Sequence, residues 1–360
     1  MIEAVRLGKI SGNGVFTQKC HEFFQKKYNF RKCLLTTSCT DALEMAAILI
    51  DIHPGDEVII PSYTFVSTAN AFVLRGTKII FADSEKNTPN IDPEKIEELI
   101  TSKTKAIIVV HYAGIACDMD KINNIAKKYH LFVIEDAAQS IDSYYNDKPL
   151  GTLGHLAAFS FHETKNVISG EGGMLVINDH RFLKRSEIIW EKGTNRSAFF
   201  RGEVAKYGWV DIGSSFLPSE LTAAFLYAQL ENLEKIQNKR INLWNHYYKY
   251  LKILEDKGLI GLPYIPDNAT NNGHLFYILC RSLKERTALI NWLKNHGIMA
   301  VFHYQSLHRS PYYSKNHDGR VLPHADGYSN NLLRLPLYYE LSTKAVRNIS
   351  ETIKQFYRVS

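Results

Sequence analysis

Two adjacent carboxylates and a later lysine are the residues of this chain whose types and spacing best suit chemistry. Glu135 and Asp136 end an apolar run at residues 131–134, and Lys165 follows Asp136 by 29 positions. Burying a carboxylate costs free energy unless a cation or hydrogen-bond donors face it. The protonated nitrogen of a heteroaromatic cofactor is one such cation, and metal ligation and a helix cap are the alternatives.

Lys165 follows a second apolar run, residues 157–161. Burial there disfavours the ammonium form, which makes the amine a nucleophile able to form a Schiff base with an aldehyde. A pyridine ring that carries an aldehyde satisfies both Lys165 and Asp136, so the pair indicates pyridoxal phosphate (PLP). Ser160, five residues earlier, is placed to reach the phosphate of the same cofactor.

Two further segments follow strand-like runs and fit the same cofactor. Cys39 and Thr40 precede the helical pattern of residues 42–50, where free backbone N–H groups and the helix dipole favour a phosphate. An ordinary Ser/Thr helix cap is the competing interpretation. Phe65 follows residues 57–61, and its ring could stack on a flat cofactor, although most aromatic residues in such positions belong to the core.

Other chemistries lack their motifs. The sequence contains no His-Glu-x-x-His pair, so we expect no catalytic metal, and it has no Gly-x-Ser-x-Gly elbow. The glycines at residues 170–173 lack the Gly-Lys-Ser/Thr of a nucleotide phosphate loop, and the absence of Gly-x-Gly-x-x-Gly disfavours a Rossmann oxidoreductase. Five widely spaced cysteines without Cys-x-x-Cys indicate a reducing cytoplasm rather than disulfides or a zinc site.

Short apolar runs alternate with helical patterns between residues 30 and 180, which predicts an α/β fold with a mostly parallel sheet covered on both faces. Ligands of such sheets bind beyond the carboxyl ends of the strands. The predicted strands are residues 34–37, 57–61, 78–82, 106–111, 131–135, 157–161 and 173–178. Predicted helices between them include residues 92–100 and 121–130.

The second part of the chain predicts a smaller α+β domain. One long helical pattern runs from Ser219 to about Leu254. Beyond it we expect strands at residues 274–280, 299–304 and 332–337, and helices at residues 284–296 and from Thr343. We therefore expect a large cofactor-binding domain over residues 1–240 and a small C-terminal domain over residues 241–360.

The composition is that of a globular protein. Of the 360 residues 45% are hydrophobic, and 43 basic against 37 acidic side chains give a net charge of +6. This mild excess fits an anionic small-molecule ligand, whereas the absence of a Lys/Arg block disfavours nucleic acid. Apolar runs are too short to span a membrane, and residues 1–6 do not resemble a signal peptide.

These residues resemble the DegT/DnrJ/EryC1/StrS family of sugar aminotransferases, which have the type I (aspartate-aminotransferase) PLP-dependent transferase fold. The similarity covers almost the whole chain and rests on residues 135–139 together with Lys165 within residues 160–166. Within the family, the chain is most similar to transaminases that form dTDP-4-amino-4,6-dideoxygalactose. That similarity rests on residues 61–68, 161–166, 191–196, 211–215, 301–304 and 334–337.

The resemblance implies a role for each matching position. Lys165 forms the imine with PLP and carries the proton between C4 of the sugar and the cofactor, while Asp136 pairs with the pyridine nitrogen. The other implied cofactor contacts are Gln139 at the ring hydroxyl, Thr40, Cys39 and Ser160 at the phosphate, Phe65 over the ring, and Ser215, where many relatives have an Asn that reaches the phosphate of the neighbouring subunit. The substrate-side candidates are His303, Tyr304, His308, Lys192 and Arg196. For His303, Tyr304 and His308, packing of strands and loops is an equally good explanation.

The implied activity is a ping-pong transamination in a cytoplasmic homodimer with its active site near the subunit interface. Glutamate is the expected donor and a dTDP-linked 4-keto-6-deoxyhexose the expected acceptor, for a glycan such as lipopolysaccharide or enterobacterial common antigen. Transfer at C3, a gluco product, and a non-catalytic relative that binds PLP or a sugar nucleotide stay open. Family members that dehydrate sugars have His where this chain has Lys165, and relatives usually carry further residues before residues 5–14, so we expect a missing N-terminal segment.

Overall fold

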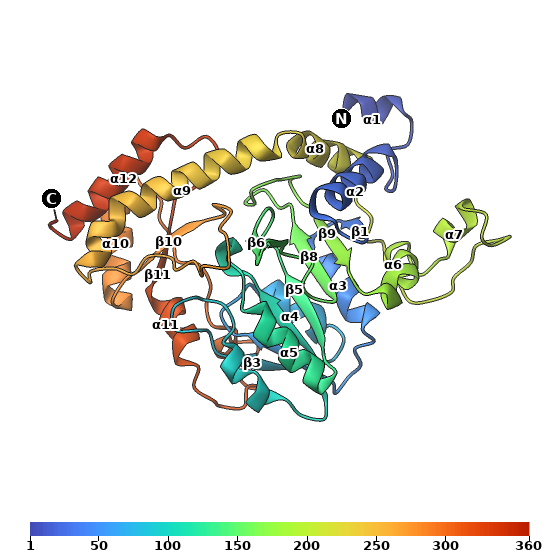
Figure 1. The fold of residues 1–360 in the computed structure, drawn as a ribbon, viewed down its shortest axis with the longest axis horizontal. Coiled ribbons are helices and arrows are strands. Elements are labelled where there is room, and N and C mark those ends of the chain that lie inside the picture. The colour runs from blue at the N-terminus through green and yellow to red at the C-terminus, as the bar shows by residue number, and fades with distance from the viewer. Residues whose placement is uncertain (360) are drawn as a thin grey trace.

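A seven-stranded sheet forms the centre of the protein in the computed structural model, which describes residues 1–359 (Figure 1). Its strands are β1 (Cys33–Thr36), β2 (Glu57–Pro61), β3 (Lys78–Ala82), β4 (Thr104–Val110), β5 (Phe132–Asp136), β8 (Leu156–Ser160) and β9 (Gly173–Ile177). Their order is β1-β9-β8-β5-β4-β2-β3, and all pairs are parallel except those that β9 makes with β1 and β8. The predicted mostly parallel sheet is confirmed, with every strand within two residues of its expected ends.

Helices cover both faces of this sheet because alternate side chains of each buried strand point to opposite sides. Ile108 of β4 packs in a cluster with α3 (Cys39–Leu49) and α4 (Val66–Val73), whereas the next residue, Val109, packs with α5 (Met119–Tyr129). Farther along the sheet, α2 (Val15–Tyr28) and α8 (Glu220–Leu230) cover β8 and β9, and α6 (Leu183–Trp190) lies on the side of α3.

A separate hydrophobic cluster forms around the long helix α9 (Leu233–Asp256). Two antiparallel strands, β10 (Phe276–Leu279) and β11 (Leu332–Leu335), join it with the helices α10 (Leu283–Asn295) and α12 (Thr343–Phe356). The cluster agrees in position with the expected small domain, but residues such as Leu307 and Tyr313 belong to the cluster of the large sheet. The boundary near residue 240 stays a prediction.

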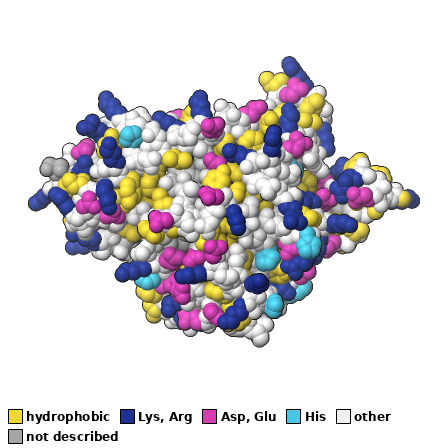
Figure 2. All heavy atoms as spheres, viewed as in Figure 1, with side chains coloured by type: hydrophobic (Ala, Val, Ile, Leu, Met, Phe, Trp, Pro, Cys, Tyr) yellow, Lys and Arg dark blue, Asp and Glu magenta, His cyan; other side chains and the backbone are white. Residues whose placement is uncertain are grey.

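The remaining elements are short. They are α1 (Ile2–Arg6), α7 (Arg196–Phe200), α11 (Pro323–Asn331), the hairpin β6 (Tyr144–Tyr145) with β7 (Lys148–Pro149), and the 3-10 turns η1 (Pro93–Lys95), η2 (Glu97–Leu99), η3 (Tyr112–Gly114), η4 (His180–Phe182) and η5 (Leu307–Arg309). None of the helices within residues 1–359 is long and apolar enough to cross a membrane. On the face in Figure 2, basic and acidic side chains are interspersed rather than gathered in one basic patch.

Three predicted elements are wrong in the structure. Residues 92–100 form η1 and η2 instead of an α-helix, and the buried Ile96 and Leu99 stand three residues apart, the period of a 3-10 turn. The helix expected from Ser219 to Leu254 is broken after α8, where Asn232 turns its side chain onto the carbonyl of Ala228. Residues 299–304 pair with β11 only through an isolated bridge, because the segment turns away along a cavity wall.

One buried carboxylate joins the start of helix α2 to the rest of the fold. Glu220, at the start of α8, is 1% exposed and accepts hydrogen bonds from the backbone N–H groups of Gly14 (2.9 Å), Phe16 (2.7 Å) and Thr17 (3.1 Å) and from the Thr17 hydroxyl. It therefore satisfies the first turn of α2, whose N-cap Gly14 has no side chain to do so.

We expect Glu220→Gln to lower the free energy of unfolding by about 2–3 kcal/mol, because charged acceptors of buried N–H groups contribute most to stability. Urea unfolding followed by circular dichroism measures the change. The matched control, Glu231→Gln, alters an exposed residue just after the same helix and should change stability by less than about 0.5 kcal/mol. Equal effects of the two substitutions would contradict this role for Glu220.

Candidate active site

A cavity of about 700 Å³ lies at the carboxyl ends of the parallel strands, where an α/β sheet binds its ligands. Nine residues predicted from the sequence line it: Cys39, Thr40, Phe65, Asp136, Gln139, Ser160, Lys165, His303 and Tyr304. Four others do not. Lys192, Arg196 and Ser215 line a second cavity of about 420 Å³, and His308 lines neither.

Lys165 lies on the loop after β8 and faces the cavity. Its backbone N–H donates to the carbonyl of His162 (2.9 Å), and Phe161 pairs with Gly172 (2.8 Å), which fixes the loop against the start of β9. Burial lowers the pKa of the Lys165 amine; Cys39 and Asp136 oppose this shift, and the charge of Arg334 reinforces it. The neutral, nucleophilic form is therefore more accessible here than on a surface lysine.

Asp136 ends β5 and is 6% exposed. Its carboxylate accepts hydrogen bonds from the Thr68 hydroxyl (2.7 Å) and from the backbone N–H of Ala138 (3.2 Å). Burial raises its pKa, while Thr68, Ala138 and the charge of Lys165 act in the opposite direction. A cation placed against this carboxylate would compensate for its burial.

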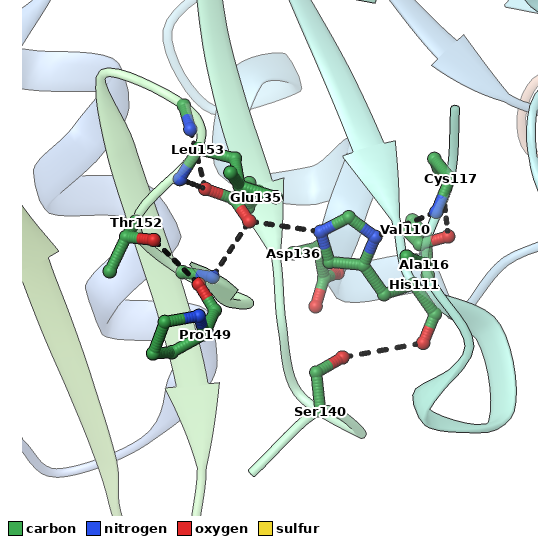
Figure 3. Close-up of polar contacts among 12 residues, drawn as sticks. Val110, His111, Ala116, Cys117, Glu135, Asp136, Ser140, Pro149, Thr152 and Leu153 are labelled. Atoms are coloured by element: carbon green, nitrogen blue, oxygen red, sulfur yellow. Dashed lines mark hydrogen bonds and ion pairs between the residues drawn. The ribbon is translucent and has the colours of Figure 1, made fainter. Parts of the chain in front are cut away.

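Glu135 points to the other side of the sheet and is completely buried (Figure 3). Its carboxylate accepts a hydrogen bond from the His111 Nε2 (3.0 Å). It also accepts hydrogen bonds from the backbone N–H groups of Gly151 (2.7 Å), Leu153 (2.8 Å) and Gly154 (2.5 Å). The His111 Nδ1 accepts from the N–H of Cys117 (3.1 Å), so Nε2 carries the proton given to Glu135. Within residues 1–359 no group of three or more His, Cys, Asp or Glu residues could hold a metal ion. Glu135 thus supports the loop behind the site, and Asp136 alone faces the cavity.

The N-terminus of α3 contributes Ser38, Cys39 and Thr40 to the lining of the cavity. Ser38 caps this helix by accepting from the N–H of Asp41 (3.0 Å), and the Thr40 hydroxyl donates to that of Ser67 (2.8 Å). The first N–H groups of the helix have no intrahelical acceptor and suit an anion. Gly173, paired with Ser160, allows the close approach of β9, because a Cβ there would lie 2.3–2.4 Å from backbone atoms of Ser38 and Cys39.

The residues of this cavity fit PLP. The α3 N-terminus and Ser160 suit its phosphate, Asp136 suits its ring nitrogen, and the Lys165 amine suits its aldehyde. Phe65 lines the same space and is 54% exposed, so its ring is free to contact a flat ligand.

Gln139, Tyr304 and His303 form one wall. The Gln139 amide accepts from the N–H of Ala113 (2.6 Å) and donates to the Tyr304 hydroxyl (3.0 Å). The Tyr304 ring stacks on His303, with centroids 3.6 Å apart, and the His303 Nδ1 lies 2.6 Å from the hydroxyl of Tyr112. Burial and the charge of Arg334 lower the pKa of His303 to about 2, so the imidazole is neutral.

Three residues of the site received no role from the sequence. Arg334 and His274 line the cavity from the C-terminal part of the chain, and Thr68 holds Asp136. Both Thr68 and Arg334 lie within segments that carry the family resemblance, which was the only signal for them. His274 is buried and its Nδ1 lies 2.8 Å from the Asn166 side chain, a pairing that no spacing in the sequence indicates.

His308 makes internal contacts instead of lining the cavity. Its Nδ1 lies 2.7 Å from the Ser62 hydroxyl and its Nε2 lies 3.6 Å from Asp326. This geometry supports the packing interpretation. Contact of His308, Lys192 or Arg196 with substrate, and of Ser215 with a neighbouring subunit, stays a prediction.

The lowered pKa of Lys165 is measurable on the protein without cofactor. We expect its acetylation rate to reach half-maximum at a lower pH than that of Lys121, because burial lowers the pKa of Lys165, whereas a hydrogen bond to Glu94 raises that of Lys121. Pulse labelling with acetic anhydride and peptide mass spectrometry gives both midpoints independently of accessibility. Coinciding midpoints would show that Lys165 is an ordinary surface amine.

The chain is similar to known proteins over almost all of its length. Residues 1–354 match the DegT/DnrJ/EryC1/StrS aminotransferase family. The uncharacterized protein MJ1066 of Methanocaldococcus jannaschii is 33% identical, covering 95% of this chain and 90% of that protein. The spore coat polysaccharide biosynthesis protein SpsC of Bacillus subtilis is 32% identical, covering 99% of this chain and 93% of that protein.

Solved structures share the fold. The aminotransferase TlmJ of Streptoalloteichus hindustanus superposes with a TM-score of 0.90 at 25% identity, covering 99% of this chain and 94% of that one. Spr1654 of Streptococcus pneumoniae, described as a sugar aminotransferase and solved in its PMP form, gives 0.91 at 25% identity, covering 99% and 95%. The expected fold, the cofactor PLP and the class of reaction are confirmed. Over almost all of its length, this chain belongs to the DegT/DnrJ/EryC1/StrS family of PLP-dependent aminotransferases.

Proposed function

We propose that the chain transfers an amino group from glutamate to C4 of a dTDP-4-keto-6-deoxyhexose and gives the dTDP-4-amino-4,6-dideoxyhexose of galactose configuration. The observation that carries the proposal is the placement of Lys165 and Asp136 in one cavity. Its volume of about 700 Å³ is within the range of small-molecule sites and leaves space beside the cofactor for a hexose.

PLP supplies an aldehyde that exchanges amino groups and a ring that accepts electrons from the substrate carbon. In the first half-reaction the Lys165 Nζ, whose pKa is lowered by burial, would take the proton from the donor carbon and pass it to the cofactor carbon that receives the amine. In the second half-reaction it would take a proton from that cofactor carbon and pass it to C4 of the sugar. Asp136 holds the proton on the ring nitrogen, and Thr68 keeps the carboxylate oriented. Phe65 and Tyr304, whose ring centroids are 6.1 Å apart, both line the cavity and would flank the ring of the bound cofactor and the sugar.

The relatives support a sugar as the acceptor. SpsC is named for polysaccharide biosynthesis, and Spr1654 is described as a sugar aminotransferase. The dTDP group, C4 and the galacto product rest on the resemblance of residues 161–166, 301–304 and 334–337. We place the reaction in the cytoplasm, where it would supply a deoxyamino sugar for a surface glycan such as lipopolysaccharide or enterobacterial common antigen.

We further propose that two copies of the chain form a homodimer. The segment around α7 projects from the rest of the chain (Figure 1). This segment carries exposed apolar side chains. Trp209 is 84% exposed and Phe200 is 69% exposed, more apolar surface than a free arm would stably offer to water. Packing this arm on a second copy would bring Ser215, Lys192 and Arg196 toward the active site of that copy.

The reaction is tested by incubating the PLP-loaded protein with glutamate and dTDP-4-keto-6-deoxyglucose and identifying the product by NMR. We expect the 4-amino galacto sugar, and no turnover by Lys165→Ala, because its side chain has no amine to move the proton. Lys165→Ala should still bind PLP without a covalent bond. A C3-amino or gluco product would replace the proposed sugar, whereas a wild-type protein that binds cofactor without any turnover would be a non-catalytic binder.

Substitutions of the two neighbouring carboxylates distinguish a role in catalysis from a role in stability. We expect Asp136→Asn to lower kcat by ~10²–10⁴-fold with little change in melting temperature, because an amide does not keep the ring nitrogen protonated. Glu135→Gln, on the opposite face, should lower the melting temperature and leave kcat per folded molecule within about threefold. Near-normal turnover by Asp136→Asn would remove its assigned role.

A further inference from the structure

His274 precedes β10 and lines the active-site cavity, although its side chain is only 7% exposed. Its Nδ1 lies 2.8 Å from the Oδ1 of Asn166, the residue that follows Lys165 in the sequence. Within residues 1–359 the other ring nitrogen, Nε2, forms no hydrogen bond, and protein atoms do not enclose it, so it faces the cavity. A nearly buried side chain with a free ring nitrogen in a ligand cavity indicates a contact with a ligand.

The amide of Asn166 determines which nitrogen of His274 carries the hydrogen. The Asn166 Nδ2 donates to the carbonyl of Asn272 (2.9 Å) and to the Gln237 Oε1 (2.8 Å), which uses both of its hydrogens. Gln237 is oriented in the same way, because its Nε2 donates to the carbonyl of Ile141 (3.3 Å). Since backbone carbonyls only accept, these contacts fix both amides. The Asn166 Oδ1 is therefore an acceptor, and the His274 Nδ1 carries the hydrogen that it receives.

His274 is uncharged as well as oriented. Burial, reinforced by the positive charges of Lys165, Arg240 and Arg334, keeps the pKa of His274 well below its ordinary value. A neutral imidazole with its hydrogen on Nδ1 has a lone pair on Nε2. His274 therefore presents a hydrogen-bond acceptor to the cavity, and this acceptor is not lost by protonation at physiological pH.

The lone pair on Nε2 selects among the molecules that enter the cavity. An ionised phosphate and the carboxylates of glutamate offer only acceptor oxygens, so they gain no hydrogen bond from Nε2. The one donor group of glutamate is its amine, which is the group that the reaction transfers. A hexose instead carries hydroxyls, whose hydrogens need an acceptor when water is displaced. The lone pair therefore suits the amino acceptor rather than the amino donor.

We propose that the His274 Nε2 accepts a hydrogen bond from the keto-sugar hydroxyl on the carbon next to the carbonyl, which is C3 of a 4-keto-hexose. The inference rests on the proposed transamination of a hexose and names the contact that recognises it. Asn166, which holds His274, is joined by a peptide bond to Lys165, the residue that moves the proton at C4. The other neighbour of C4 in a 6-deoxyhexose, C5, carries a methyl group and no hydroxyl. His274 is thus a specificity-determining residue for the acceptor.

The tautomer is measurable on the wild-type PLP-loaded protein with heavy nitrogen in its histidines. Long-range hydrogen–nitrogen correlation spectra distinguish a protonated from an unprotonated ring nitrogen, and the His274 signal is identified by its loss in His274→Gln. We expect an unprotonated Nε2 from about pH 8 to about pH 6, because the pKa of His274 is lowered. A hydrogen on Nε2 in this range would overturn the proposal.

The hydroxyl is tested by comparing dTDP-4-keto-6-deoxyglucose with its 3-deoxy analogue. We expect the analogue to lower kcat/KM of the wild type by about 10- to 100-fold, since a buried acceptor then stays unpaired. In His274→Leu the two sugars should differ by less than about threefold, because no lone pair distinguishes them. His274→Gln, whose amide oxygen reaches toward the position of Nε2, should restore part of the difference. A preference that persists in His274→Leu would overturn the proposal.

Two controls separate this role from effects on folding and on the cofactor. The ratio of the two sugars is independent of how much of each variant is folded, and His53→Leu, which replaces an exposed histidine before β2, should keep the wild-type ratio. Conversion of the cofactor to its amine form by glutamate alone, followed by absorbance, should change by less than about threefold in His274→Leu. A loss in this half-reaction equal to the loss with the keto-sugar would show that His274 acts on Lys165, and would overturn the proposal.

The same comparison keeps the inference separate from the proposed function. If the wild-type protein reacts with glutamate, rejects dTDP-4-keto-6-deoxyglucose and accepts another keto-sugar, the proposed sugar is wrong. The accepted sugar is then compared with its analogue that lacks the hydroxyl next to the carbonyl. A preference for the hydroxyl that disappears in His274→Leu would support the role of His274, whereas equal rates in the wild type would overturn it.

Discussion

The site depends on holding a carboxylate and an amine in one cavity without letting them form an ion pair. Lys165 and Asp136 influence each other's pKa, yet within residues 1–359 no ion pair of 4.0 Å or less joins them. Local contacts keep them apart: Thr68 and Ala138 hold the carboxylate, and the backbone of the Lys165 loop bonds to His162. Had the two charges paired, they would have filled the space in which a ring with a nitrogen at one end and an aldehyde at the other must fit.

The period of a β-strand assigns different tasks to two carboxylates that are neighbours in sequence. Side chains at consecutive positions of β5 leave opposite faces of the sheet, so Glu135 and Asp136 never share an environment. Glu135 meets three backbone N–H groups and His111 and is satisfied within the protein (Figure 3). Asp136 meets only two donors and is left with capacity for a ligand. From the sequence, either Glu135 or Asp136 could have paired with a cationic ligand. Because side chains alternate along β5, only Asp136 is left for that role.

Apolar runs of four to six residues bounded by polar ones located the whole central sheet, because its strands are buried on both faces and have no competing helical period. Prediction from apolar patterns failed where buried residues lie in 3-10 turns or in irregular segments. Residues 92–100, which include the buried Ile96 and Leu99, form 3-10 turns instead of the predicted helix. The strand predicted at residues 299–304 instead follows the cavity wall. The large-domain half of the site was predictable because each chemical residue follows its strand. Arg334 and His274 were not, since their place in the site depends on how the C-terminal segment packs against the sheet.

The two parts of the site, from the large sheet and from the C-terminal segment, have different chemical tasks. Residues from the sheet ends and α3 meet the groups that every PLP enzyme must hold: a phosphate, a ring nitrogen and an aldehyde. Residues after 270 supply the wall that a substrate meets, with a neutral His303, a tyrosine bound to Gln139, and one uncompensated guanidinium. Substitutions on that wall can alter which molecules enter without disturbing how the cofactor is held, because the two groups of residues share few hydrogen bonds. Hydrogen bonds from Gln139 to Tyr304 and between Tyr112 and His303 join the substrate wall to the residues at the sheet ends, so these contacts position the wall relative to the cofactor site.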